Sequence, residues 1–344
     1  MINVADYVQG ARDQVPENVW CYFEGGAGDE VTLRANVAAY GRWRFRPRML
    51  VDVSEISLRT TLLGTEVAMP LGIAPFAMQS LLQPKGECAT ARAAAAAGLL
   101  MTVSTLTTCT HEEIRAAADG PRWLQLYVLR DRQKTLDHIA EAKEAGYGAV
   151  VVTVDLPYLG RRERDLRLGF MNPPLDIDLP YATLFEPTPA LTWRDLEWIR
   201  SEIGLPLVVK GILTREDATL AVEHGADAVW VSNHGGRQLD HVAAGLDALP
   251  EVAEAVGGRC EVYVDGGIRR GADVLKALAL GARAAFAGRA IACGLAVGGE
   301  EGVRDVLDIV RGELELGLGL LGCVSPGHVT RSHVEPVLPY DPVA

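Results

Sequence analysis

The stretch DAVWVSNHGGRQLD, residues 227–240, joins a short apolar run to a polar turn, and the rest of the chain is interpreted from it. Residues 228–231 are apolar and favour β-structure, as is typical of a strand buried on both faces. Residues 232–236 are turn formers that end the strand. His234 and Arg237, a potential base and a cation, therefore stand at a strand end, where barrels and open α/β sheets place their chemistry.

The same alternation of apolar run, polar turn and Ala-rich or amphipathic stretch recurs from Pro70 onward. The apolar runs predict eight strands, at 71–74, 99–103, 123–128, 149–154, 206–209, 228–231, 261–264 and 284–287. The stretches between them predict helices at 86–97, 111–118, 132–145, 193–203, 215–224, 245–256 and 271–279, with a last helical region after Arg289. Eight such units predict a (β/α)8 TIM barrel. The alternative is a doubly wound open sheet, but no G-x-G-x-x-G follows the first strand.

Length leaves the number of domains open, and we interpret the whole chain, 1–344, as one barrel domain. Residues 1–69 are expected to form an N-terminal helical and irregular cap. The connection at 156–191, after the fourth strand, is longer than the others and carries six prolines. A loop of this length is either disordered or a lid, and its position at the catalytic end favours a lid.

Composition excludes several classes of function. Hydrophobic residues make up 49% of the chain, which supports a large core, and the net charge of −12 makes nucleic acid an improbable partner. The six cysteines form no C-x-x-C pair and no metal-type Cys/His cluster, so we expect reduced thiols, no metal and a cytoplasmic protein. No signal peptide is recognisable, and no run approaches the ~18 apolar residues of a membrane helix.

Polar side chains collect at the ends of the predicted strands, as a barrel enzyme requires. They include Ser104, Gln125, Tyr127, Thr153, Asp155, Lys210, Ser232 and Asp265. Glycines follow the last two strands, at Gly266, Gly267 and Gly288, with Arg269 and Arg289 beside them. Such turns before helix starts predict a phosphate cradle, although tight turns alone would also need glycine.

His234 favours an enzyme with a cofactor over a barrel that only binds a metabolite. A carboxylate such as Asp155 would fix the imidazole tautomer and stabilise the imidazolium that forms when His234 takes a proton. Arg237 suits a substrate carboxylate, which it can bind with two hydrogen bonds. Lys210 would place a positive charge beside an electron-accepting ring system. Together these groups predict oxidation of a 2-hydroxy acid over a phosphate-anchored cofactor.

The motif SNHGGRQLD at 232–240 resembles the active-site signature of the FMN-dependent 2-hydroxy acid oxidases and dehydrogenases. This group includes glycolate oxidase, lactate oxidase, mandelate dehydrogenase and hydroxymandelate oxidase. The likeness spans nearly the whole chain, with FRPRMLVDVS at 45–54, APFAM at 74–78, QLYV at 125–128, TVDLPYLGRR at 153–162, VKGI at 209–212, DGGIRRGADVLKALALGA at 265–282 and GR at 288–289.

The resemblance implies FMN as cofactor and assigns roles to individual residues. His234 would be the base and Asp155 its orienting carboxylate, while Tyr127 would bind the hydroxyl or carboxylate of the substrate. Arg237 and Tyr22 would hold the substrate carboxylate, with support from Arg162 in the lid. The residues implied for FMN are Pro75, Ala77, Ser104, Gln125, Thr153, Lys210, Ser232, Asp265, Gly266, Gly267, Arg269, Gly288 and Arg289. Tyr22, read without the resemblance, would be a packing residue of a cap helix.

Two departures from the short-chain oxidases bear on the substrate. Leu106 stands where they tend to carry Trp, and the space that an indole would fill fits a larger, aryl substrate of the mandelate type. Phe76 stands where they tend to carry Thr. The resemblance implies (S)-2-hydroxy acid oxidation to the 2-oxo acid, with oxygen as acceptor giving hydrogen peroxide, and a homotetramer. The alternatives are another electron acceptor, an amine or peptide-derived substrate, and a barrel that binds flavin without turnover.

Overall fold

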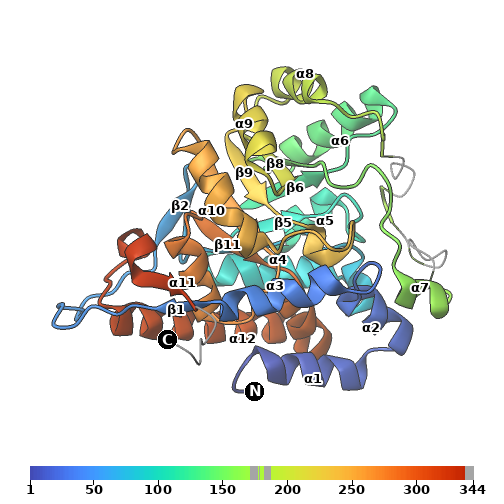
Figure 1. Ribbon diagram of the computed structural model, residues 1–344. Coiled ribbons are helices and arrows are strands. Elements are labelled where there is room, and N and C mark those ends of the chain that lie inside the picture. Colours follow the sequence, from blue (N-terminus) through green and yellow to red (C-terminus); the bar gives the residue numbers. More distant parts are fainter. Residues whose placement is uncertain (171–176, 178, 182–186, 338–344) are drawn as a thin grey trace.

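The computed structural model describes residues 1–170, 177, 179–181 and 187–337. A closed barrel of eight parallel strands lies at its centre, which confirms the predicted (β/α)8 fold (Figure 1). Neighbouring strands follow the chain order, and β11 closes the barrel against β4. The strands are β4 (Leu71–Ile73), β5 (Met101–Val103), β6 (Arg122–Leu126), β7 (Val150–Thr153), β8 (Leu207–Ile212), β9 (Ala228–Val231), β10 (Glu261–Asp265) and β11 (Ala284–Ala287).

Helices surround the barrel and begin and end close to the predicted positions. They are α4 (Gly86–Ala96), α5 (His111–Ala117), α6 (Arg132–Glu144), α8 (Trp193–Ile203), α9 (Arg215–Glu223), α10 (Gly245–Val256), α11 (Gly271–Ala279) and α12 (Arg289–Leu321). Capping residues explain two of these boundaries. Asp131 caps α6 by accepting the N–H groups of Gln133 and Lys134, and Gly257 ends α10 with a left-handed φ of 59°.

Large aromatic side chains fill the inside of the barrel. Trp123, Trp230, Tyr263 and Phe286 are almost completely buried there, and the rings of Trp230 and Phe286 have centroids 3.9 Å apart. The other face of each strand packs on the helices in a second, larger apolar cluster. Because the strands are buried on both faces, their sequences are continuous apolar runs rather than alternating ones.

The predicted cap at 1–69 consists of three helices, a strand and a hairpin, which contact different parts of the protein. Helices α1 (Val4–Gln14), α2 (Glu17–Glu24) and α3 (Val31–Gly41) belong to the cap, and β1 (Trp43–Phe45) pairs with β12 (Val334–Pro336) near the C-terminus. The hairpin of β2 (Thr60–Leu62) and β3 (Thr65–Val67) instead packs Leu62 and Val67 into the barrel interior. The sequence did not predict α1, α3 or this hairpin.

The predicted lid at 156–191 is described only in part, since 171–176, 178 and 182–186 lie outside the described residues. Its first half contains the short helix α7 (Glu163–Arg167), where Arg164 forms an ion pair with Glu30 of the cap. Its second half rejoins the barrel at Pro187, which forms an isolated bridge with Leu129. Within the described residues, no helix is both long and apolar enough to span a membrane.

Candidate active site

A cleft of about 1080 Å³ opens at the carboxyl ends of the barrel strands, between the cap and the first half of the lid. All but two of the residues predicted for catalysis or cofactor binding line this cleft. The exceptions, Asp155 and Ser232, lie directly behind lining residues, where they hydrogen-bond His234 and Lys210.

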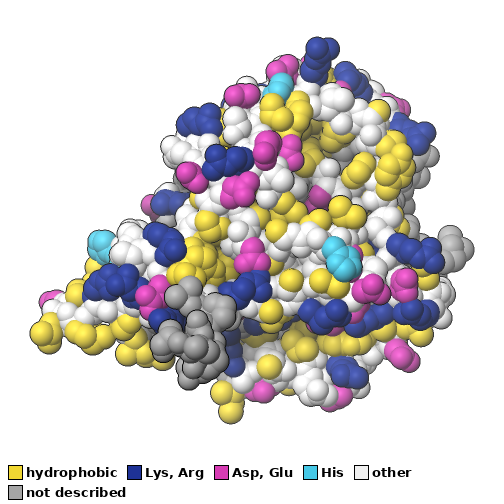
Figure 2. Space-filling model, viewed as in Figure 1, with side chains coloured by type: hydrophobic (Ala, Val, Ile, Leu, Met, Phe, Trp, Pro, Cys, Tyr) yellow, Lys and Arg dark blue, Asp and Glu magenta, His cyan; other side chains and the backbone are white. Residues whose placement is uncertain are grey.

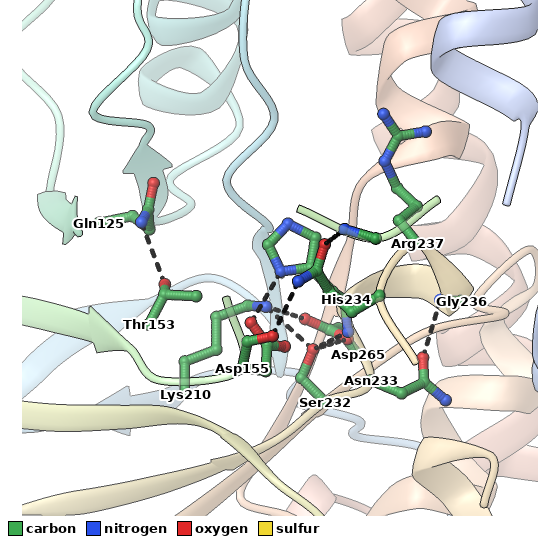
Figure 3. A network of polar contacts seen from close by, with 12 residues as sticks. Gln125, Thr153, Asp155, Lys210, Ser232, Asn233, His234, Gly236, Arg237 and Asp265 are labelled. Atoms are coloured by element: carbon green, nitrogen blue, oxygen red, sulfur yellow. Dashed lines mark hydrogen bonds and ion pairs between the residues drawn. The ribbon is translucent and has the colours of Figure 1, made fainter. Parts of the chain in front are cut away.

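His234 and Asp155 form a hydrogen-bonded pair at the centre of the site (Figure 3). The distance from Nδ1 of His234 to Oδ1 of Asp155 is 2.9 Å. Burial pushes the pKa of Asp155 upward, but His234 and Lys210 hold it below its ordinary value. Burial lowers the pKa of His234 despite the carboxylate beside it. The pair therefore consists of an ionised acid and a neutral imidazole that donates from Nδ1, which leaves Nε2 with its lone pair as the base.

Three groups that suit a carboxylate surround His234. The guanidinium of Arg237 lies over the ring of Tyr22, with its carbon 4.8 Å from the ring centroid, and donates to the carbonyls of Tyr22 and Gly25. Arg162 is buried, which lowers its pKa to about 10, and its Nε lies 3.4 Å from the carbonyl oxygen of Arg237. Burial raises the pKa of Tyr127, so its hydroxyl stays protonated. The structure thus brings the predicted carboxylate-binding residues together.

Lys210 lies at the base of the cleft in a buried ionic cluster. Its Nζ donates to Oγ of Ser232 at 2.9 Å and lies 3.4 Å from Oδ2 of Asp265. Ser232 in turn donates to Asp265 at 2.7 Å and accepts the backbone N–H of His234 at 3.0 Å. The hydroxyl of Ser232 therefore links the cation to the base. Figure 3 shows Gln125 and Thr153 on the other side of the lysine, joined by a hydrogen bond of 3.0 Å.

The glycine turn after β10 has a structural cause as well as the predicted phosphate role. Gly266 and Gly267 have φ values of 91° and 84°, which residues other than glycine rarely adopt. A Cβ on Gly267 would lie 2.1 Å from the backbone oxygen of Asn36 in α3. The close approach of the cap thus requires glycine here.

Arg289 is predicted to bind phosphate, and the structure places it in a network with the cap. It donates to the carbonyls of Phe23, Gly25 and Gly235, and burial lowers its pKa to about 9. Arg269 lies 4.0 Å from Glu24 on the same side of the cleft. Both arginines still line the cleft, as do Lys210 and Gln125.

This distribution fits FMN. A flavin ring needs amide and ammonium partners, and a phosphate needs backbone N–H groups and arginines at the far end of the same cleft. Gln125, Thr153, Lys210 and Ser104 would hold the ring system, while Gly288 and the two arginines Arg269 and Arg289 would face the phosphate. The orphaned Oδ2 of Asp155, which has no partner among the described residues, is the one buried carboxylate oxygen at the site left for a further donor.

Sequence reasoning gave no role to several residues that shape the site. Gln238 donates to the carbonyls of Asp155 and Tyr158 and so fixes the backbone that carries the acid. Asn233 and Asp240 bind the cap helix α3. All three belong to the motif at 232–240, and their polarity beside the base was the available signal. Asn36, the partner of Asn233 in the cap, carried no signal in the sequence.

A (β/α)8 barrel with a base, a carboxylate-binding group and a flavin cradle at its carboxyl end defines a class, the flavin-dependent oxidoreductases. Comparison with known proteins makes the assignment specific. Residues 11–336 match the sequence model of the FMN-dependent dehydrogenase family, and the chain belongs to this family. FMN is accordingly its cofactor, as predicted.

Relatives cover the chain almost end to end. A peroxisomal (S)-2-hydroxyacid oxidase of Arabidopsis thaliana is 45% identical over 97% of this chain and 96% of its own length. Glycolate oxidase 3 of Oryza sativa subsp. indica is 45% identical over 96% of this chain and 95% of its own. The solved structure of mandelate oxidase with benzoyl-formic acid is 43% identical, covers 98% of this chain and 99% of its own, and has a TM-score of 0.93.

Proposed function

We propose that the protein oxidises an (S)-2-hydroxy acid to the corresponding 2-oxo acid, with oxygen as the electron acceptor and hydrogen peroxide as the second product. The observation that carries the proposal is the neutral, acid-oriented imidazole of His234 in one cleft with Arg237 and Arg162. A base beside two cations suits a substrate that has a hydroxyl next to a carboxylate.

The residues predicted for catalysis divide this chemistry among them. Arg237, Tyr22 and Arg162 bind the carboxylate and orient the substrate, and Nε2 of His234 takes the hydroxyl proton. Asp155 stabilises the imidazolium that results. FMN, which Gln125, Thr153 and Lys210 would hold, would supply the acceptor for the hydrogen and the two electrons that leave the substrate carbon. Lys210 contributes a fixed positive charge to the cleft, held in place by Asp265.

The substrate side chain is proposed to be aryl, as in mandelate. Leu106 is buried at the cleft wall, where its aliphatic side chain leaves more room than an indole would. Phe23, Phe76 and Leu159 add apolar surface to the same cleft. The similarity to solved structures of mandelate oxidase supports this choice.

The test is anaerobic reduction of the FMN-loaded protein by glycolate, lactate, mandelate and 4-hydroxymandelate. We expect mandelate or 4-hydroxymandelate to bleach the flavin fastest. His234→Ala should keep FMN and lose about 10²–10⁴-fold in reduction rate, the range that general-base catalysis contributes. Mandelamide, which lacks the carboxylate, is the matched control and should react poorly.

Three results would contradict the proposal: a flavin that stays oxidised with every acid, preferential reduction by amines, or full-rate reduction of His234→Ala. Mixing the reduced protein with oxygen or with an artificial dye identifies the acceptor. Fast reoxidation by oxygen with stoichiometric hydrogen peroxide is expected, whereas slow reoxidation would favour a dehydrogenase with another acceptor.

We further propose a cytoplasmic homotetramer. A projecting arm, visible at the left of Figures 1 and 2, exposes Met49, Leu50 and Val51, with exposed fractions of 70%, 106% and 43%. Exposed apolar side chains of this size in one segment favour burial against another subunit. Light scattering of the purified protein measures the assembly, and a monomer at micromolar concentration would contradict it. Fractionation of the source cells tests the compartment.

A further inference from the structure

Two buried amides join the cap to the catalytic loop. Nδ2 of Asn36, in α3, donates to Oδ1 of Asn233 at 2.9 Å, and Nδ2 of Asn233 donates to Oδ1 of Asn36 at 2.8 Å. The two residues are only 2% and 4% exposed. Oδ1 of Asn36 also accepts the backbone N–H of Gly245. Because buried amides need partners, this reciprocal pair fixes the orientation of the Asn233 side chain.

Asn233 directly precedes the base and closes the turn that carries it. Its Oδ1 accepts the backbone N–H of Gly236 at 3.0 Å, across the residues of the short helical turn His234–Gly236. His234 has a φ of 57°, and the two glycines after it have φ values of 65° and 75°. A residue with a Cβ is strained in this left-handed region and stays there only where its surroundings impose it. The amide of Asn233 supplies that constraint.

Asp240, at the C-terminal end of the motif at 232–240, also holds helix α3. Glu30, at the N-terminus of α3, has a φ of 59° and provides no side-chain cap. Asp240 caps α3 instead, since its carboxylate accepts the N–H groups of Thr32 at 2.8 Å and Val31 at 3.2 Å. Helix α3 and the motif are therefore joined at two separate points, and Asn36 is the one that reaches the turn of the base.

We propose that Asn36 is a positioning residue for catalysis, which acts through Asn233 to hold the imidazole of His234 in its working orientation. The inference rests on the proposed function, in which His234 is the base. The base and the carboxylate-binding group are held by different contacts, because Arg237 donates to the carbonyls of Tyr22 and Gly25. Loss of the amide pair should therefore slow proton abstraction and leave carboxylate binding intact.

The variants compared are Asn36→Leu, Asn36→Asp and Thr32→Val, all prepared with FMN. Leucine removes both hydrogen bonds of the pair. The neutral acid of Asn36→Asp keeps a donor and an acceptor in the place of the amide. Thr32→Val is the matched control, since it removes the two hydrogen bonds between Thr32 and Val242 from the same helix without touching the turn 234–236.

The measurements are the limiting rate of anaerobic flavin reduction, the Kd of benzoylformate, which is the 2-oxo acid product of mandelate oxidation, the FMN content and the unfolding midpoint. Asn36→Leu is expected to reduce at least about 10-fold more slowly, with benzoylformate Kd within about 3-fold and FMN retained. Relative to the wild type at the same pH, Asn36→Asp should recover part of the rate, most at low pH, where its buried acid is neutral. Thr32→Val should lower the unfolding midpoint and reduce at nearly the normal rate.

A double-mutant cycle with His234→Ala gives the sharpest test, because a residue that acts through His234 has nothing left to lose in that background. Equal rate losses from Asn36→Leu with and without His234 would overturn the proposal. So would equal losses from Asn36→Leu and Thr32→Val, or a loss of FMN in Asn36→Leu. A wild-type protein that no 2-hydroxy acid reduces would instead refute the proposed function, which keeps the two failures distinct.

Discussion

Two buried histidine sites lie in the same barrel and differ in what surrounds them. At the first, the base site, His234 bonds Asp155 and its side chain is 19% exposed to the cleft. At the second, the histidine pair, His111 and His138 are 2% exposed and have ring centroids 5.0 Å apart. No carboxylate hydrogen-bonds either ring of the histidine pair among the described residues, where the hydrogen-bonding partner of His111 is the hydroxyl of Tyr147.

Burial lowers the pKa at both sites, to about 3 for His111 and about 4 for His138. The lowered pKa is therefore not what makes a histidine a base in this molecule. What distinguishes His234 is a carboxylate behind the ring and an open cleft in front of it. A buried histidine that has neither the carboxylate nor the cleft is a neutral packing group, and the predictions below test this distinction.

The largest effect is expected from Asp155→Asn, which gives the base site the carboxylate-free surroundings of the histidine pair. The amide cannot stabilise the imidazolium, so kcat/KM should fall at least about 100-fold. Because Asp155 raises the pKa of His234, its removal lowers that pKa. The neutral base then persists to lower pH, and the acid limb of the kcat/KM profile should move to lower pH.

A pH-rate profile of the wild type and the variant checks this prediction. An acid limb that stays in place, or one that moves to higher pH, would show that another group controls it. FMN content and the unfolding midpoint serve as controls, since Asp155 is buried behind the cleft and its replacement must not be confused with unfolding.

The sequence predicted the barrel well because its signals are local. The strand Ala228–Val231 and the helices Trp193–Ile203 and Gly245–Val256 have the predicted bounds, which follow from apolar runs, caps and glycine stops within a few residues. His234 and Asp155 were found because both stand at strand ends, and parallel strands bring their ends to one edge.

Contacts between distant segments could not be predicted in this way. Asn36 and Asn233 are separated by 197 positions, and nothing in either segment predicts that the two side chains meet. Arg289 looked like a phosphate ligand alone, but the structure also gives it three backbone carbonyls of the cap and the motif as partners. Tyr22 came only from the family resemblance, because a tyrosine in a short helix predicts packing.

A smaller effect, on stability alone, is expected from His138→Phe at the histidine pair. The pKa of His138 is about 4 in the fold and ~6.5 when unfolded, so the unfolded state binds more protons below pH 6.5. Stability is therefore lost as the pH falls from about 6.5 toward 4, by about 2 kcal/mol at pH 5 from this residue. Both ring nitrogens lack partners among the described residues, so phenylalanine leaves no polar group unpaired.

Urea unfolding at pH 7 and pH 5 measures the difference. The wild type should lose about 2 kcal/mol more than His138→Phe between these values, with activity the same in both. Identical pH dependence in His138→Phe and the wild type would mean that the fold does not lower the pKa of His138.

The smallest effect is expected from Tyr181→Phe, where the lid meets the histidine pair. The ring of Tyr181 stacks on His111 with centroids 4.8 Å apart and packs on the edge of His138, and its hydroxyl accepts the backbone N–H of His111 at 3.1 Å. Phenylalanine keeps the ring contacts and leaves that N–H without its acceptor, which should cost about 1 kcal/mol of unfolding free energy.

Because Tyr181 does not line the cleft that contains His234, the turnover of Tyr181→Phe should stay within about 2-fold of the wild type. Tyr181→Ala also removes the ring contacts that attach this part of the lid to α5 and α6, so it should raise KM more than it lowers kcat. If Tyr181→Phe instead lowered kcat as strongly as Asp155→Asn, the histidine pair would belong to the catalytic site, and the distinction between the two sites would fail.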